Sequence, residues 1–313
     1  KSCIVSLHCS LAYNIPFYMS QANLTRYAWL SIATAFFTLG LKMVAYWMTN
    51  SVGMLSDAIE SIVNVGAAIM ALTMLHIAAR PADDDHAFGH SKAEYFSSGF
   101  EGALIFVAAV SIIGAAWPRL FHPQAIDALN WGFAISMLAS MFNLITSLIL
   151  FKAAKKYNSI TLEADAHHLM TDVWTSIGVL IAIVAVAITG WYVLDALIAI
   201  AVALNILWTG WSLLYRSVAG LMDAALPHNE VEQIKTILDN YSQQHGILYQ
   251  NLKTRQAGAR KFVSVNILVN GNWSVQQGHD LVDIIETDIE QKIQGCHVLT
   301  HLEPIEAPSK HHF

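Results

Sequence analysis

Charged residues are scarce in this sequence: Asp, Glu, Lys and Arg make up 13% of its 313 residues. A typical soluble domain carries about 25% charged residues. Hydrophobic residues reach 55%, and the mean hydropathy is +0.46. This shortage of charge excludes an ordinary soluble protein and indicates a chain that crosses a membrane several times.

Cysteine and several catalytic motifs are also in short supply. Cys3, Cys9 and Cys296 form neither a metal motif nor a disulfide framework, as expected of a protein that faces a reducing cytosol. The sequence lacks a Gly-rich phosphate loop, a nucleophile elbow and a His-Glu-x-x-His helix. We therefore expect no enzyme activity, and the reading as an intramembrane metalloenzyme fails.

What the chain does contain is six long apolar stretches. Each one reaches or approaches the roughly 20 residues that a helix needs to cross the hydrocarbon layer. The stretches are Tyr27–Met48, Met54–Ala78, Tyr95–Trp117, Leu129–Phe151, His168–Ile188 and Val193–Tyr215. We expect an α-helical membrane protein with six transmembrane helices.

Basic residues are concentrated on one side of these spans. Arg119 lies on the opposite side, whereas the loops and flanks of the first side hold Arg26, Arg80, Lys92, Lys152, Lys155, Lys156 and Arg216. By the positive-inside rule, both termini are expected in the cytoplasm. We expect a multi-pass protein of a bacterial inner membrane.

After Leu221 the sequence becomes polar, with short β-rich runs. The patterns predict helices over 230–244 and 275–293, and strands over 249–256, 262–269 and 297–304. This αββαβ order suits a cytoplasmic ferredoxin-like domain. We expect four parts: an extension or disordered N-terminus at 1–18, a six-span transport domain at 19–221, the ferredoxin-like domain at 222–306 and a tail at 307–313.

Two pairs of polar residues lie inside spans two and five. Glu60 and Asn64 are four residues apart, as are His168 and Asp172, so each pair shares one face of a helix. Ionisable groups at membrane depth are costly and usually mark an ion pathway. Two such pairs facing each other would form a four-ligand site for a divalent cation. The alternative is hydrogen bonding between helices alone, to which two carboxylates with only Lys42 nearby are poorly suited.

Four further acidic residues accompany these pairs. Asp57 and Asp165 lie closer to the helix ends, where they could cap a helix or support a ligand, and we interpret them as non-ligands. Glu94 and Glu101 enter span three and are left unassigned.

A third cluster lies in the loop between spans two and three. Asp83, His86 and His90 fall within eight residues, and imidazole and carboxylate groups are frequent zinc ligands. The alternative is a solvated acidic loop with incidental histidines. The residues alone favour neither interpretation.

The chain after Met19 resembles the cation diffusion facilitator family of divalent-metal/proton antiporters. Four motifs in order on a six-span frame carry the resemblance: SVGMLSDAIES at Ser51–Ser61, PADDDHAFGHSKAE at Pro81–Glu94, EADAHHLMTD at Glu163–Asp172 and LMDAALP at Leu221–Pro227.

The resemblance implies a homodimer with cytoplasmic ferredoxin-like domains. By position it implies a tetrahedral transport site of Glu60, Asn64, His168 and Asp172, and a loop site of Asp83, His86 and His90. It also favours metal binding over the solvated-loop interpretation. Lys92 and Asp223 occupy the positions of a charge interlock between the membrane and tail regions.

The sequence departs from the family at the transport site. Many members have two Asp, or His and Asp, where this chain has Glu60 and Asn64, so the site here has two anionic ligands rather than three. These two charges would just neutralise a divalent ion. The hard, neutral Asn oxygen shifts preference from zinc toward Mn²⁺, Fe²⁺ or Co²⁺. Zn²⁺ remains the first expectation, with Cd²⁺ a further possibility.

A second departure concerns the ferredoxin-like domain. Gln250 and Asn266 stand where zinc-binding members place His residues, which leaves His279, His301 and Glu303 as the matching candidates for a tail site. We expect this domain to hold one weakened metal site or none.

These expectations combine into a mechanism in which a divalent cation is exported and protons are the counter-ion. In alternating access, the ion binds Glu60, Asp172 and a neutral His168 from the cytosol, and protons displace it on the far side. The alternative function is a membrane metal sensor or scaffold that binds metal without moving it. We expect a bilayer and metal ions as partners, and no nucleic acid.

Overall fold

A computed structural model of the chain describes residues 24–49, 52–122 and 131–306. Within the helices, the side chains of residues 49, 52–57, 60 and 131–133 lie outside the description. The predicted extension at 1–18 and the tail at 307–313 fall outside the described residues. The chain forms two compact units, Lys1–Val218 and Ala219–Phe313, which we call the bundle and the tail unit.

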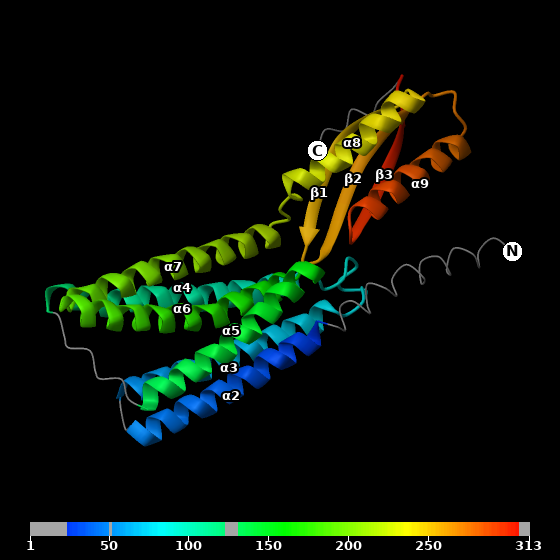
Figure 1. Ribbon diagram of the computed structural model, residues 1–313. Coiled ribbons are helices and arrows are strands. Elements are labelled where there is room, and N and C mark those ends of the chain that lie inside the picture. The colour runs from blue at the N-terminus through cyan, green and yellow to red at the C-terminus, as the bar shows by residue number, and fades with distance from the viewer. Residues whose placement is uncertain (1–23, 50–51, 123–130, 307–313) are drawn as a thin grey trace. The chain divides into compact units, whose positions relative to one another are not determined.

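The bundle consists of long apolar helices (Figure 1). They are α2 (Thr25–Thr49), α3 (Val52–Ala78), α4 (Ala93–Phe121), α5 (Trp131–Tyr157), α6 (Ile160–Thr189) and α7 (Val193–Leu221). Across the described ranges, six helices are long and apolar enough to cross a membrane. The prediction of six transmembrane helices is confirmed.

Many large apolar side chains point outward from these helices. Trp47, Val107, Ile188 and Trp208 are each more than half exposed. Water would penalise so much exposed apolar surface, whereas lipid tails solvate it. The bundle is therefore built for a hydrocarbon surrounding.

The fifth span begins earlier than predicted. The expected start was His168, but α6 begins at Ile160 and is capped by Ser159, whose side chain accepts a hydrogen bond from the amide of Leu162. One of the intervening polar residues, Asp165, lies inside the bundle, where one of its carboxylate oxygens accepts a hydrogen bond from Ser31 at 2.9 Å. The helix therefore continues through residues that interrupt the apolar pattern.

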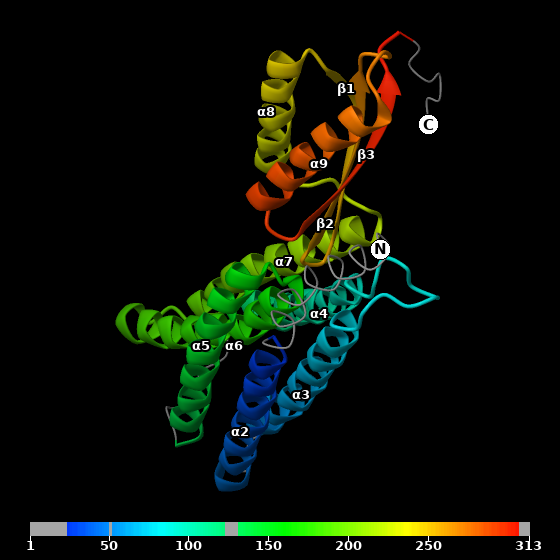
Figure 2. The ribbon, with the colours of Figure 1, turned by 90° about the vertical axis from the view of Figure 1, so that its right-hand side faces the viewer.

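The bundle helices approach one another closely where side chains are small. α2 packs against α3 and α5, and α6 packs against α4 and α5. α4 and α7 lie side by side (Figures 1 and 2). A Cβ added to Gly210 of α7 would lie 2.8 Å from the backbone nitrogen of Phe106, so only glycine permits this approach.

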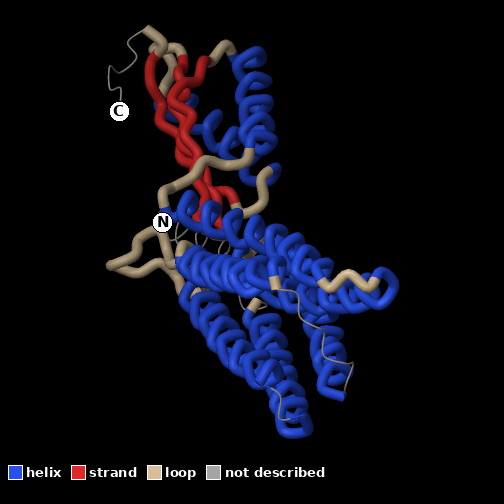
Figure 3. The backbone as a smooth tube through the Cα atoms, turned by 90° about the vertical axis from the view of Figure 1, so that its left-hand side faces the viewer, coloured by secondary structure: helices blue, strands red, loops and turns tan. Residues whose placement is uncertain are grey.

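The tail unit contains two helices and one mixed sheet (Figure 3). Its elements are α8 (His228–His245), β1 (Leu248–Ala257), β2 (Arg260–Val269), α9 (Val275–Lys292) and β3 (Cys296–Pro304). The strand order is β1-β2-β3, with β1 antiparallel and β3 parallel to β2. The predicted αββαβ fold is confirmed.

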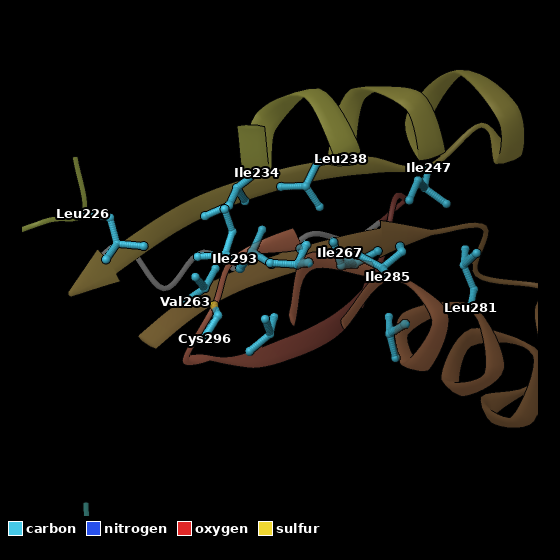
Figure 4. Packing of buried hydrophobic residues seen from close by; sticks show 14 of the residues in the cluster. Leu226, Ile234, Leu238, Ile247, Val263, Ile267, Leu281, Ile285, Ile293 and Cys296 are labelled. Atoms are coloured by element: carbon cyan, nitrogen blue, oxygen red, sulfur yellow. The ribbon is translucent and has the colours of Figure 1, made fainter. Parts of the chain in front are cut away.

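One hydrophobic core joins both helices to the sheet. Ile234 and Leu238 of α8 and Ile285 of α9 are fully buried with Val265 and Ile267 of β2, and Figure 4 shows the α8 residues pointing toward the strands. Alternate residues of β2 face this core because strand side chains alternate between faces. The tail unit has the core of an independent domain.

Candidate metal centres

The central cluster of the bundle links α3 to α6. Nδ2 of Asn64 donates a hydrogen bond to Oδ2 of Asp172 at 3.0 Å. Oδ1 of Asn64 lies 2.9 Å from Nε2 of His168. Because an amide oxygen can only accept, Nε2 carries the hydrogen in this arrangement. The structure thus brings together three of the four residues predicted for the transport site.

The hydrogen bonds leave one histidine nitrogen available. The His168 residue is only 9% exposed, and its Nδ1 atom is buried without a hydrogen-bond partner. A buried nitrogen whose lone pair has no partner costs free energy, and a cation bound to it would remove that cost. A metal ion is a suitable occupant.

The fourth predicted ligand, Glu60, lies on α3 one turn before Asn64. Its side chain is outside the described residues, as is that of Asp57. The role of Glu60 as a ligand stays a prediction.

Two residues that sequence reasoning did not assign to the site also contact Asp172. Asn143 of α5 is 1% exposed and donates from Nδ2 to Oδ2 of Asp172 at 2.9 Å. Nζ of Lys42, on α2, lies 3.8 Å from the same oxygen. The signal for both was present, since each is a polar residue inside an apolar span.

The other buried acids are held by hydroxyl groups. Asp165 accepts from Ser31 of α2 at 2.9 Å through one oxygen, its other oxygen is buried without a hydrogen-bond partner, and its non-ligand role stays a prediction. Glu94 accepts a hydrogen bond from Ser159, and Glu101 lies 3.5 Å from the hydroxyl of Ser97. Glu94 thereby fixes α4 to the start of α6.

The loop site is compact and largely exposed. One ligand atom from each of Asp83, His86 and His90 lies within 4.8 Å of the others, and no other group of three or more such side chains occurs among the described residues. Asp83 lies 3.3 Å from Nδ1 of His86 and 3.4 Å from Nε2 of His90. The fold therefore places these three residues together, in favour of the metal-binding interpretation.

The loop backbone prepares these side chains for a cation. Nδ1 of His90 lies 3.1 Å from the carbonyl oxygen of Pro81, so it carries the hydrogen and leaves the lone pair of Nε2 beside Asp83. The backbone N–H of His86 donates to Asp83 at 2.7 Å and lowers the pKa of that carboxyl group. Asp83 is therefore anionic at neutral pH.

The tail site has a different character. Glu303 is 4% exposed and accepts hydrogen bonds from Gln250 at 3.3 Å and from Asn266 at 2.8 Å. His301 lies 3.6 Å from Glu303, whereas His279 is exposed and lies 3.4 Å from Asp283. The two amides thus donate to the carboxylate that a metal would otherwise bind, and the expectation of weak or absent metal binding stays a prediction.

The residues of the predicted interlock fall in separate units. Lys92 precedes α4 in the bundle. Asp223 belongs to the tail unit, where its carboxylate lies 3.1 Å from Nη1 of Arg255. The interlock between Lys92 and Asp223 stays a prediction.

Two family models match the chain. The model of the cation efflux transmembrane domain matches residues 28–222. The model of the cytoplasmic domain of cation efflux proteins matches residues 226–305. Together they cover most of both compact units.

Similar proteins span nearly the whole chain. The uncharacterized transporter sll1263 of Synechocystis sp. is 51% identical over 288 residues, which cover 92% of this chain and 93% of the relative. The cation-efflux pump FieF of Klebsiella pneumoniae is 29% identical over 282 residues, 90% of this chain and 92% of the pump. A solved structure described as the zinc form of CzrB is 31% identical, with 28% of this chain and 97% of that one covered and a TM-score of 0.26.

Proposed function

The chain belongs to the cation diffusion facilitator family of divalent-metal cation efflux transporters, and on that premise we propose that it exports a transition-metal ion in exchange for protons. The transport site would consist of Glu60, Asn64, His168 and Asp172. The observation that carries the proposal is the hydrogen-bonded contact of Asn64 with His168 and Asp172 across α3 and α6. Intramembrane groups that can take up either a cation or protons suit an exchanger.

The mechanism follows from the chemistry of these ligands. From the cytosolic side, a metal ion binds once the carboxylates are ionised and the imidazole is neutral, because ligands must give up their protons. On the far side, protons compete for the same atoms and release the ion. Imidazole suits this exchange because it ordinarily titrates near pH ~6.5.

The amide ligand influences metal choice. In the structure Asn64 presents its N–H group to Asp172 and its oxygen to His168. When an ion replaces these contacts, the amide oxygen becomes a hard, neutral ligand. We propose Zn²⁺ as the first substrate, with Mn²⁺, Fe²⁺, Co²⁺ and Cd²⁺ as alternatives.

The remaining proposals concern the loop site, the oligomeric state, the location and the domain boundaries. We propose that Asp83, His86 and His90 bind a metal ion in the loop, where their spacing and the fixed His90 ring support it. We further propose a homodimer in a bacterial inner membrane with both termini in the cytoplasm. Residues 19–221 would form the transport domain and residues 222–306 the cytoplasmic domain.

A flux measurement tests this function. The purified protein is reconstituted into liposomes that contain a metal-sensitive dye, and uptake of Zn²⁺, Mn²⁺, Fe²⁺, Co²⁺ and Cd²⁺ is followed with an acidic lumen. Uptake should depend on the pH gradient and stop when a protonophore removes it. Metal binding without uptake for any of these ions would instead support a sensor or scaffold.

A further inference from the structure

Lys42 occupies an unusual position for a basic residue. It lies well inside α2, its side chain is 6% exposed, and its ammonium is 3.8 Å from Oδ2 of Asp172. The same oxygen accepts hydrogen bonds from Asn64 of α3 and Asn143 of α5. One carboxylate oxygen on α6 is therefore surrounded by positively polarised groups from three other helices.

We propose that Lys42 is the resident counter-cation of the transport site, which the transported ion must displace in order to bind. The inference rests on the proposed transport function. It makes Lys42 a residue that sets the affinity of the site and the rate of release, without being a ligand itself.

Charge balance supports this role. Glu60 and Asp172 together bring two negative charges, and Lys42 compensates one of them when no ion is bound. A divalent ion beside the ammonium would leave an excess positive charge in a poorly solvated site, where like charges repel strongly. The ammonium must therefore move away from Asp172 as the ion enters, and the flexible four-carbon stem of lysine permits such a movement.

The same competition promotes release. Once protons weaken ion binding, the ammonium can return to Asp172 and occupy its oxygen. The ion then cannot rebind to that carboxylate. We expect a transporter with moderate affinity and rapid turnover, because affinity is lowered by the cost of displacing Lys42.

A purely structural role would give a different outcome. If the ion pair only held α2 against α6, its loss would lower stability and leave the affinity of the transport site unchanged. The two roles are separated by the Michaelis constant and the turnover number, measured together with the melting temperature.

The experiment compares Lys42→Gln and Lys42→Met with wild type in reconstituted liposomes, using Zn²⁺ and Mn²⁺ as probes. Lys152→Gln serves as the matched control, because Lys152 is an exposed lysine on α5. For the Lys42 variants we expect KM to fall about tenfold or more and kcat to fall as well, since release is slowed. Lys152→Gln should match wild type in both constants.

Lys42→Arg provides a second arm that keeps the charge. A guanidinium can hold Asp172 through two hydrogen bonds, so KM should rise about tenfold. An unchanged KM in the neutral variants overturns the proposal. Should both neutral variants fail to fold, a wild-type KM in Lys42→Arg overturns it. The absence of uptake by wild type would instead refute the transport function itself.

Discussion

The side chain of Asn64 lies between His168 and Asp172, accepting from the imidazole at 2.9 Å and donating to the carboxylate at 3.0 Å. The Asn64 amide thereby links α3 to α6, with its oxygen toward His168 and its N–H group toward Asp172. A bound cation would require the oxygen of this amide to face it, because a metal ion is attracted to the oxygen and repelled by the N–H group. Metal binding at this site would therefore require the Asn64 amide to reorient.

Replacing Asp172 with Ala should abolish transport while the protein stays folded. Asp172 supplies one of two formal anions in the proposed site, and its removal leaves only the charge of Glu60 to balance a divalent ion. Flux into liposomes measures transport, and size-exclusion chromatography reports the assembly. Asp195→Ala is the matched control, because Asp195 lies on α7 and contacts Arg119. Flux near the wild-type rate in Asp172→Ala would contradict the assignment.

Asn64→Asp should tighten zinc binding about tenfold by adding a third anion. Slower ion release is expected to accompany the gain. Calorimetry at fixed pH measures the affinity in a protein whose loop site is removed by alanine at Asp83, His86 and His90. Unchanged or weaker binding would mean that residue 64 does not face the metal.

Asn143→Ala should destabilise the bundle by about 1–3 kcal/mol, because a buried carboxylate loses a hydrogen-bond donor. It should also reduce transport, since Asp172 is then held by fewer groups. Thermal unfolding and flux are measured side by side with Asn205→Ala, an exposed asparagine of α7. Equal stability and equal flux in the two variants would show that Asn143 is dispensable.

His90→Ala should weaken zinc binding to the loop about 10- to 100-fold, because it removes both a ligand nitrogen and the contact with Pro81. Binding is measured by calorimetry in an Asp172→Ala background, with His76→Ala as the control for an exposed histidine of α3.

The acid sensitivity of the loop follows from Asp83. Its lowered pKa means that the carboxylate stabilises the turn above its ordinary value of 3.8 and that this contribution is lost as the pH falls through the lower, folded-state pKa. An NMR titration in which Asp83 protonates above its ordinary pKa would contradict this account. For the preceding prediction, a His90→Ala variant that binds zinc like wild type would show that His90 is not a ligand of the loop site.

The isolated segment from Pro227 to Pro308 should keep its secondary structure and its association constant when a chelator is added. Gln250 and Asn266 already satisfy Glu303, and a hydrophobic core rather than an ion holds the segment together. Circular dichroism and sedimentation measure the two properties. A cooperative loss of association on chelation, restored by zinc, would show that His279, His301 and Glu303 bind a metal with further partners.

The sequence alone determined the class of fold and predicted the candidate site residues, three of which the structure brings together at the proposed transport site. Six apolar stretches of membrane-spanning length have few stable alternatives to transmembrane helices, because unsatisfied backbone groups are costly in hydrocarbon. The spacing of Asn64, His168 and Asp172 on two helices likewise follows from the helical period. Alternation in β2 and the two amphipathic helices were enough to predict the αββαβ tail.

The tertiary structure decided which helices meet and which groups share an atom. Apolar periodicity did not show that Lys42 and Asn143, more than 100 and nearly 30 residues from Asp172 along the chain, contact the same oxygen. Nor could the start of α6 be read from hydropathy, because Asp165 is buried beside Ser31, a hydrogen-bond donor 134 positions away. Local patterns report the cost of burying a polar group, whereas the partner that offsets this cost is fixed only when distant segments pack together.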